Sequence, residues 1–329
     1  MKFRHAGDAC PFLSVLLTIY KEPKEWIKES IESILNQTFE CFELFLINDN
    51  PNSTINKQII VEYEMRDSRV RGIFNEKNVG LPASLNKGIF LAKGKYIARM
   101  DADDISLPER FEKQIYFLEN HPEVGICGTY AKIISDTSKN GKPLINHETD
   151  AEIKSALLFY CPFVHPSVMG RTSIFRDNLY DTNCRIAQDF ELWLRIANKT
   201  QFYNIPEFLL NYRIHNKQSR TNLDEKQLRL NQYYLIDKIM DYYVIDSKYR
   251  EVFTSIFFLS KVSVREVKEF FRYLINNKFN SLSYDYLVQR YIEIEFVNKH
   301  YFNAMMNPLS SKHPLRYLKA FTKFLRKRK

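Results

Sequence analysis

Three carboxylates lie within four residues, at Asp101, Asp103 and Asp104, directly after an apolar segment. Carboxylates this close repel one another unless a cation or another basic group offsets their charge. Oxygen ligands on a loop suit a hard divalent ion such as Mg²⁺ or Mn²⁺, which keeps positions for water and phosphate oxygens. The alternative is a solvated acidic turn before a helix, because Ser106 and Glu109 have the spacing of a capping box. Spacing alone leaves both interpretations open.

The elements around these carboxylates follow an alternating pattern over the first 110 residues. Repeated strand–helix units predict an α/β fold with a mostly parallel sheet covered on both faces. Such sheets bind ligands beyond the carboxyl ends of their strands, so the polar loops at 18–22, 48–53 and 101–104 are expected to converge. The expected strands are 12–19, 42–47, 70–74 and 96–100, and the expected helices are 24–38, 57–65 and 81–92.

The chain changes character after residue 120. A strand signal at 124–130 and a helical pattern at 187–197 occur in a mixed region that extends to about residue 220. From 221 to 310 the pattern is helical and rich in Tyr and Phe. We therefore expect a C-terminal helical region after the α/β domain. The expected boundaries are 1–219 for the α/β domain, 220–311 for the helical region and 312–329 for a basic tail.

The net charge of +9 is concentrated in the last 18 residues. Eight basic residues and no acidic one lie in 312–329, so the rest of the chain is nearly neutral. This distribution argues against a nucleic-acid-binding surface. From Pro314 onward a helical wheel separates aromatic and aliphatic residues from basic ones, which favours an interfacial helix on an anionic membrane surface. A helix docked on the protein with a solvated basic face is the alternative.

The cysteines and the N-terminal segment indicate in which cellular compartment the protein is expected. Five widely spaced cysteines without a C-x-x-C pair argue against a disulfide framework and favour a reducing compartment. The apolar residues 9–20 follow Lys2 and Arg4, yet Asp8 and the lack of a small-x-small site favour a buried strand over a signal peptide. No segment approaches the roughly 20 apolar residues that span a bilayer.

Six segments carry a family resemblance: SVLLTIY at 14–20, SILNQT at 33–38, ELFLIND at 43–49, NVGL at 78–81, LNKG at 85–88 and GKYIARMDADDISLPERF at 94–111. In this order they resemble glycosyltransferase family 2. The resemblance is closest to the subgroup typified by amylovoran-biosynthesis enzymes, which build bacterial surface polysaccharides. It covers roughly residues 11–219.

The resemblance implies a GT-A fold, a nucleotide-sugar donor, a divalent cation (Mn²⁺ or Mg²⁺) and inversion at the anomeric carbon. One departure is Asn-Asp-Asn at 48–50, where the family often has Asp-Asp-Gly. By resemblance the donor-binding residues are Thr18, Tyr20 and Glu22 in the nucleotide pocket, Asp49 on the uracil, Asn86 and Lys87 near the ribose or phosphates, and Asp101 and Asp103 on the ribose and the metal.

The segment AQDFELWLR at 187–195 resembles the family's Glu-Asp segment, with Gln188 in place of the usual Glu. The resemblance implies that Asp189 is the general base, because a positioned carboxylate can take the proton of an attacking hydroxyl. A carboxylate that complements the helix dipole is the alternative. Glu191 is the rival base, and residues at this helical spacing do not share a face. Trp193 is expected in the core or in a pocket wall that contacts the acceptor.

Two histidines add to the expected site. His165 begins HPSVM at 165–169, where the resemblance implies a contact with the acceptor or the diphosphate, and a turn histidine is the alternative. His215 ends the region of resemblance, and in related enzymes a histidine here joins the metal or the diphosphate. The Gln-x-x-Arg-Trp motif of processive members is absent, so one sugar per encounter is expected.

The leading hypothesis is a metal-dependent inverting glycosyltransferase. It moves a single sugar from a UDP-sugar to a glycan acceptor, such as an undecaprenyl-diphosphate-linked saccharide, in O-antigen, capsule or exopolysaccharide biosynthesis. The expected location is cytoplasmic and peripheral, on the inner face of the cell membrane. The sequence leaves open whether the chain forms a homo-oligomer.

Other classes of protein fit less well. A sugar nucleotidyltransferase would need a basic Gly-rich loop after the first strand, where this chain has Thr-Ile-Tyr-Lys-Glu-Pro. No G-x-G-x-x-G or G-x-x-x-x-G-K-[ST] motif supports a dehydrogenase or a P-loop NTPase. A catalytically silent scaffold of a polysaccharide-assembly complex is the alternative from another class, and the intact Asp101, Asp103 and Asp189 argue against it.

Overall fold

The computed structural model describes residues 11–135, 141–184, 186–215, 225–258 and 263–276, together with 287 and 290. These residues form two compact units. The first lies within 1–149 and 161–223, and the second within 150–160 and 224–329. The short segment 150–160 thus belongs to the second unit, although it precedes residue 220 in the chain. The single expected boundary at residue 220 does not account for this segment. The basic tail 312–329 lies outside the described residues.

The first unit is built on a nine-stranded sheet with the order β3-β2-β1-β4-β8-β6-β9-β5, and β7 pairs with β6 off this path. The strands are β1 Leu13–Ile19, β2 Phe42–Asn48, β3 Val70–Phe74, β4 Tyr96–Asp101, β5 Ile105–Ser106, β6 Val124–Ile134, β7 Pro143–Leu144, β8 Met169–Arg171 and β9 Gln201–Arg213. The helices of this unit are α1 Lys24–Leu35, α2 Thr54–Arg66, α3 Leu81–Leu91, α4 Arg110–Asn120, α6 Thr172–Asp177 and α7 Gln188–Ile196.

One half of the sheet is entirely parallel. β1 pairs with β2 and β4, and β2 pairs with β3, all in parallel register. Its strands are apolar runs because both faces are covered, and Leu13, Val15 and Leu17 of β1 are fully buried. In this register Thr18 lies opposite Asp101 on β4, and Ile19 lies opposite Asn48 on β2. The polar loops after these strands therefore start at one edge of the sheet.

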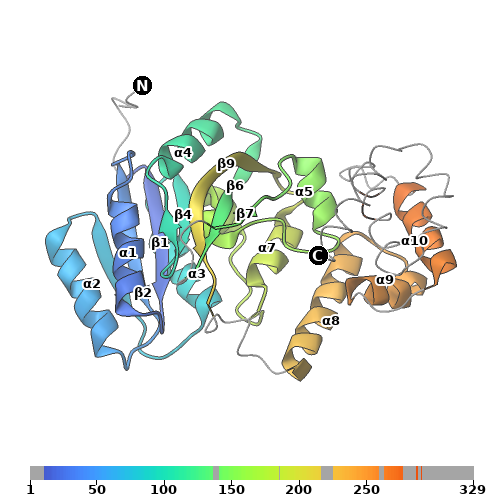
Figure 1. Ribbon diagram of the computed structural model, residues 1–329, viewed down its shortest axis with the longest axis horizontal. Coiled ribbons are helices and arrows are strands. Elements are labelled where there is room, and N and C mark those ends of the chain that lie inside the picture. Colours follow the sequence, from blue (N-terminus) through green and yellow to red (C-terminus); the bar gives the residue numbers. More distant parts are fainter. Residues whose placement is uncertain are drawn as a thin grey trace. The chain divides into compact units, whose positions relative to one another are not determined.

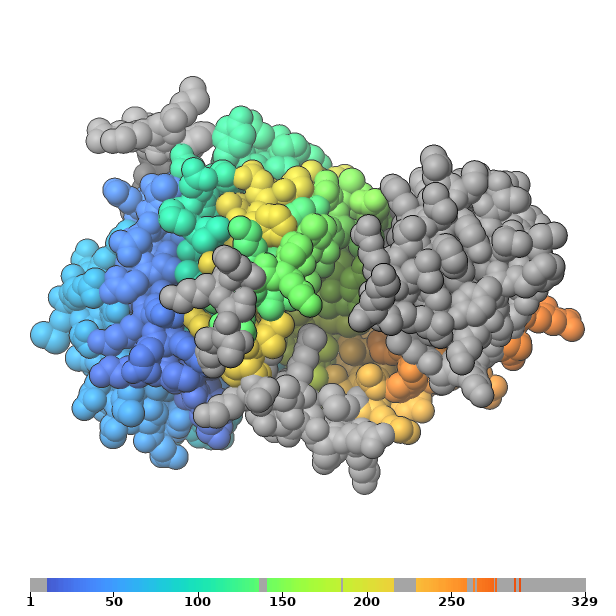
Figure 2. Space-filling model, in the orientation of Figure 1, coloured from blue at the N-terminus to red at the C-terminus, as the bar shows by residue number. Residues whose placement is uncertain are grey.

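The other half of the sheet is mixed. β8 pairs antiparallel with β4 and with β6, and β6 runs parallel to the long strand β9. Figure 1 shows β9 beside β6, and Figure 2 shows the blue segments and the green and yellow segments side by side in the first unit. The short strand β5 pairs antiparallel with β9, with Ile105 opposite Asn211. This pairing brings the end of β9 to the turn that follows β4.

The second unit is helical in its described part. Its helices are α5 Asp150–Ala156, α8 Glu225–Tyr242, α9 Arg250–Phe257 and α10 Val264–Asn276. Aromatic side chains fill its interior: the Phe159 ring lies 6.1 Å from that of Phe271 and 6.4 Å from that of Phe253, centroid to centroid. The expected fold class, an α/β domain followed by a helical region, is confirmed. In the described part of the chain, no helix is both long and apolar enough to cross a membrane.

Candidate active site

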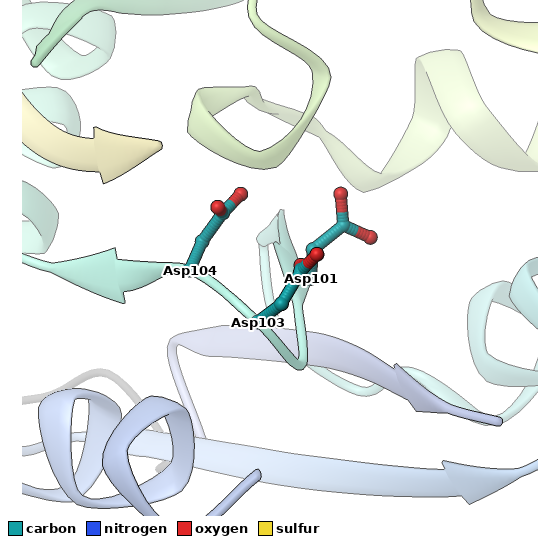
Figure 3. A group of neighbouring side chains, drawn as sticks. All are labelled: Asp101, Asp103 and Asp104. Carbon is teal, nitrogen blue, oxygen red and sulfur yellow. The ribbon is translucent and has the colours of Figure 1, made fainter. Parts of the chain in front are cut away.

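The acid cluster, which comprises Asp101, Asp103 and Asp104, lies at the carboxyl end of β4. Asp101 ends the strand, and the other two residues follow in the turn before β5. One ligand oxygen from each of the three carboxylates lies within 4.8 Å of the others. Figure 3 shows the three side chains projecting from this single turn. The cluster is thus a compact set of oxygen atoms suited to a hard divalent cation.

Asp101 forms an ion pair with Arg99, two residues earlier on β4. Arg99 is 4% exposed, and its Nε and Nη1 atoms have no hydrogen-bond partner among the described residues. Burial, together with the charges of Asp103 and Asp189, raises the pKa of Asp101 to about 6 against the lowering effect of Arg99. Asp189, on α7, therefore lies close enough to the acid cluster to affect its ionisation.

Asp104 is the buried member of the cluster. Its Oδ1 accepts a hydrogen bond of 2.8 Å from the backbone N–H of Arg213, at the end of β9. Its Oδ2 is buried without a partner among the described residues. Burial raises the pKa of Asp104 well above its usual range, and the charges of Asp103 and Asp101 add to this effect. A buried carboxylate oxygen without a partner is unusual, and a cation or a proton would satisfy it.

His215 joins the cluster from the segment after β9. Its Nε2 lies 2.9 Å from Oδ2 of Asp103, and its ring lies 4.8 Å from that of Trp26, centroid to centroid. The neighbouring Arg213 donates from Nε to the backbone oxygen of Asp103, at 2.8 Å. The histidine and the carboxylates expected around a metal are thus brought together by the pairing of β5 with β9. His215, which lies beside Asp103, also adds an imidazole nitrogen to the atoms that could bind a metal ion.

Helix α1 fixes the backbone of the acid turn. Ser30 donates from its hydroxyl to the backbone oxygen of Asp101 at 2.8 Å, and the Ser33 hydroxyl accepts from the backbone N–H of Ser106 at 3.0 Å. Gln37 donates from Nε2 to the hydroxyl of Ser106, at 3.1 Å. The SILNQT segment therefore acts by holding the acid turn in place.

The capping box considered for this turn is not formed. Helix α4 begins at Arg110, and Glu109 at its N-cap makes no side-chain capping bond. Ser106 lies on β5 instead, where its hydroxyl accepts from Gln37. The acid cluster is consequently not explained as the cap of a following helix.

The carboxylate of Asp49, after β2, is engaged within the chain. Its Oδ1 accepts from Nδ2 of Asn75 and from the backbone N–H of Val79, and its Oδ2 accepts from the backbone N–H of Gly80, each at 2.9 Å. Gly80 has φ +85°, a conformation that favours glycine. Lys87 donates from Nζ to Oδ1 of Asn75 at 2.7 Å. Asp49 and Lys87 thus fasten the entry to α3.

The segment after β1 adds a further acidic group. Oε2 of Glu22 accepts from the backbone N–H of Tyr20, at 2.7 Å. Burial raises the pKa of Glu22 to about 7, and the charges of Asp103 and Asp101 add to the rise. Thr18 is partly buried opposite Asp101 on the neighbouring strand. Two of the expected pocket residues, Thr18 and Glu22, therefore lie near the acid cluster, whereas the Tyr20 side chain is exposed.

Helix α7 carries both base candidates, in different environments. Asp189 is buried at the start of the helix, and its Oδ2 accepts from the thiol of Cys161 at 3.5 Å. Both oxygens of Glu191 accept from Arg195, at 2.8 and 3.1 Å. The helix follows Ala187, which has φ +56°. Glu191 is thus held in an ion pair, whereas among the described residues the side-chain donor to Asp189 is the weak thiol of Cys161.

His165 and Asn86 meet at Tyr180. Nε2 of His165 lies 2.8 Å from the hydroxyl of Tyr180. Asn86 donates from Nδ2 to the backbone oxygen of Tyr180 at 2.8 Å and accepts from its backbone N–H at 2.9 Å. Burial raises the pKa of Tyr180, so the phenol stays neutral. Asn86, expected near the ribose or phosphates, is engaged with the backbone of another segment.

Trp193 is a core residue. Its side chain is 0% exposed. Its ring packs against those of Phe163, Phe175 and Phe202, at centroid distances of 5.3, 6.4 and 6.5 Å. A side chain without exposed surface cannot touch an acceptor, so that expectation for Trp193 is corrected in favour of the core.

Several site residues were not expected from the sequence. Arg99 and Arg213 hold the acid cluster, and Tyr180 and Cys161 contact the residues on the other side of the site. A signal for Arg99 was present, because a charged residue inside an apolar strand needs a buried partner. Tyr180 and Cys161 had no such signal, because their partners are distant in sequence.

Comparison with known proteins gives the family. Residues 14–181 match the sequence model described as Glycosyl transferase family 2. An uncharacterised glycosyltransferase of Methanocaldococcus jannaschii is 40% identical over 231 residues, which are 69% of this chain and 78% of that protein. The O-antigen biosynthesis glycosyltransferase WbnJ of Escherichia coli is 36% identical over 213 residues, 63% of this chain and 82% of that protein.

Solved structures give the fold. TarS 1–349 of S. aureus in complex with UDP-GlcNAc superimposes with a TM-score of 0.58 at 14% identity, over 89% of this chain and 88% of that chain. The complex of the same protein with UDP gives a TM-score of 0.56 at 14% identity, over 95% of this chain and 91% of that chain. At this identity the likeness establishes the shared fold, and the expected GT-A fold is confirmed.

Proposed function

The chain belongs to glycosyltransferase family 2 and is a glycosyltransferase, and from this premise we propose that it moves one sugar from a UDP-sugar to a hydroxyl of a glycan acceptor, with inversion at the anomeric carbon. The observation that carries the proposal is the acid cluster with His215 at the carboxyl edge of the parallel strands. Ligands bind at this edge in open α/β sheets.

The residues present fit a divalent cation. Three carboxylates lie together, and Asp104 has a buried oxygen without a partner in the described part of the chain. Asp101, Asp103 and His215 would hold Mn²⁺ or Mg²⁺. When bound, the ion supplies positive charge to the departing diphosphate, which is a large part of the catalysis of such transfers. Arg99 and Arg213 keep the carboxylates in place before the donor binds.

Asp189 is the proposed general base. It is buried and lies near Asp101, and within the described part of the chain its carboxylate accepts from the weak thiol donor of Cys161. Glu191 is held by Arg195, so it is not free to take a proton from an acceptor hydroxyl without breaking that pair. A carboxylate within hydrogen-bond reach of the hydroxyl can accept its proton during attack.

UDP is the proposed nucleotide of the donor. The TarS structures contain UDP and UDP-GlcNAc, and they share the fold of this chain. Asp49 accepts three N–H groups, and a carboxylate has about four acceptor sites, so one site remains for a uracil N–H. Thr18, Tyr20 and Glu22 would line the pocket beside it.

The proposed acceptor is a glycan on a lipid diphosphate such as undecaprenyl diphosphate, in bacterial surface-polysaccharide biosynthesis. The name of WbnJ, an O-antigen biosynthesis enzyme, and the resemblance to amylovoran-biosynthesis enzymes support this pathway class. The basic tail 312–329 supports a peripheral location on the inner face of the cell membrane, through its charge and apolar side. Removal of 312–329 should abolish binding to anionic vesicles and leave transfer to a soluble acceptor intact.

A donor and metal screen tests the proposal. UDP-Gal, UDP-Glc, UDP-GlcNAc and UDP-GalNAc are each offered with a lipid-diphosphate-linked GlcNAc acceptor, with and without Mn²⁺. We expect transfer from one of these donors, and only with the metal. Metal-independent transfer would refute the assignment of Asp101 and Asp103. No transfer from any donor would favour the silent scaffold, and formation of a nucleotide sugar from a sugar phosphate and UTP would favour a nucleotidyltransferase.

A further inference from the structure

A chain of hydrogen bonds runs from α3 to the side of the site that holds the base candidate. Asn86 on α3 makes two hydrogen bonds to the backbone of Tyr180, of 2.8 and 2.9 Å. The Tyr180 hydroxyl in turn lies 2.8 Å from Nε2 of His165. Asn86 and Tyr180 are 94 residues apart in sequence, so these bonds tie two distant segments together.

The geometry at Asn86 resembles the pairing of two strands. Its side-chain amide offers one donor and one acceptor, and both meet the complementary groups of a single residue, Tyr180. An amide in this arrangement fixes the position of the backbone that it holds, because both bonds must break before that backbone can shift. This engagement leaves only one N–H and one acceptor site of Asn86 for any other contact.

Tyr180 lies near both the acid cluster and Asp189. Its side chain is buried, and its ionisation responds to Arg99, Asp189 and Asp101. Since burial keeps the phenol neutral, its hydroxyl can serve His165 as a hydrogen-bond partner at any physiological pH. The ring of His165 also packs edge-on to Trp193, at 6.2 Å between centroids. His165 is thus held from two sides.

We propose that Tyr180 is a positioning residue for the acceptor side of the site: Asn86 fixes its backbone, and its hydroxyl orients His165 on the side of the site that holds Asp189. The inference rests on the proposed function and on the role that the family resemblance implies for His165, a contact with the acceptor or the diphosphate. In this proposal Asn86 orients Tyr180 and does not bind the donor ribose directly. Neither role follows from the spacing of these residues in the sequence.

The test separates acceptor kinetics from donor binding. Tyr180→Phe removes the hydroxyl and keeps the ring, and we expect kcat/KM for the acceptor to fall about tenfold, the size of one lost buried hydrogen bond. The Kd for UDP with Mn²⁺, measured by calorimetry, should stay within about twofold of wild type. Tyr233→Phe, at a partly exposed tyrosine of the second unit, is the matched control and should leave both quantities unchanged.

A double-mutant cycle tests whether Asn86 and Tyr180 act through the same hydrogen bonds. Asn86→Ala removes both bonds to Tyr180, and the combined variant Asn86→Ala/Tyr180→Phe should lose less acceptor kcat/KM than the product of the two single losses. Independent roles would give the full product and would overturn the inference. A loss of UDP affinity in Asn86→Ala as large as its loss of acceptor kcat/KM would also overturn it, because that result identifies a donor ligand.

The outcomes distinguish this inference from the function on which it rests. If the wild-type chain transfers sugar and Tyr180→Phe keeps its acceptor kinetics, the inference fails and the proposed function stands. If the wild-type chain transfers no sugar from any donor, the proposed function fails and the inference with it. Thermal denaturation of each variant shows whether it is folded at the assay temperature, and the Asn86→Ala variant carries the test if Tyr180→Phe is not.

Discussion

The loops after β2 and β4 both carry acidic side chains at the same edge of the sheet, yet the chain treats them differently. After β2, Asp49 accepts three hydrogen bonds from N–H groups. After β4, three carboxylates share a volume in which their oxygens lie within 4.8 Å, and Asp104 keeps an oxygen without a partner in the described structure. A carboxylate that accepts three N–H groups of the chain stabilises the fold, whereas crowded carboxylates are suited to bind a cation.

The same contrast separates two residues on α7. Glu191 accepts from Nε and Nη2 of Arg195, and Asp189 accepts from the Cys161 thiol. This difference between the two carboxylates follows from their hydrogen-bond geometry. Of two acidic groups on one helix turn, the one that has no strong partner among the residues described is the one that can accept a proton from a substrate.

The largest expected effect is at Asp189. Asp189→Asn removes the proposed proton acceptor at almost constant volume, and we expect kcat to fall by about 10²- to 10⁴-fold, the usual contribution of a general base. Glu191→Gln is the matched variant, and we expect it to weaken the Arg195 pair while kcat falls less than about tenfold. Steady-state kinetics with saturating donor measure both. Transfer at the wild-type rate by Asp189→Asn would reject the proposed base.

The acid cluster gives the next effect. Asp103→Asn removes a proposed metal ligand, and we expect kcat to fall by about 10²- to 10³-fold, as when a preorganised electrostatic group is lost. We also expect the thermal midpoint of the variant to lose its response to Mn²⁺, because binding to the native state is what stabilises it. Asp241→Asn, an exposed change in the second unit, serves as the control. A Mn²⁺ response that survives in Asp103→Asn would contradict the assignment.

A smaller effect, on stability, is expected at Asp49. Asp49→Asn places an amide donor among three N–H groups, and a buried donor left without an acceptor costs about 1–3 kcal/mol. We therefore expect a lower free energy of unfolding in urea, with the Mn²⁺ response retained. Unchanged stability would reverse the comparison of the two loops, because the three N–H groups on Asp49 would then not stabilise the fold.

The parallel half of the sheet could be predicted closely from the sequence. The expected strand 70–74 coincides with β3, and the ends of β1, β2 and β4 lie within one residue of expectation. Each of these strands is an apolar run that ends in a polar loop, so local pattern and tertiary position agree. The acid cluster was predictable for the same reason, because its residues are adjacent in the chain.

β9 was not predicted, and the cause lies at 206–207. Pro206 and Glu207 interrupt its apolar pattern, and the pairing with β6 passes from Thr129 opposite Ile205 to Tyr130 opposite Phe208. This bulge accommodates a proline that a regular central strand would not accept. β9 is also the strand that carries His215 to Asp103. The non-local part of the site, including Asn86 on Tyr180, depends on such pairings and has no local signal.

A dependence of stability on pH is also expected. Burial raises the pKa of Glu22 from 4.5 to about 7, with Asp103 and Asp101 adding to the rise. The native state therefore holds this proton more tightly than the unfolded state does. The resulting stabilisation is fully present below pH 4.5 and is lost as the pH rises to about 7. Metal-free protein should thus lose stability across this window, as measured by urea unfolding at a series of pH values.

Glu22→Gln separates this residue from the other titrating groups. The amide cannot ionise, so the variant should show a shallower decline of stability between pH 4.5 and 7 than wild type. Glu251→Gln, at an exposed position in the second unit, should leave the decline unchanged. An identical decline in Glu22→Gln would mean that neither burial nor the charge of the acid cluster raises the pKa of Glu22. The crowding that distinguishes the loop after β4 from the loop after β2 would then be confined to the acid turn itself.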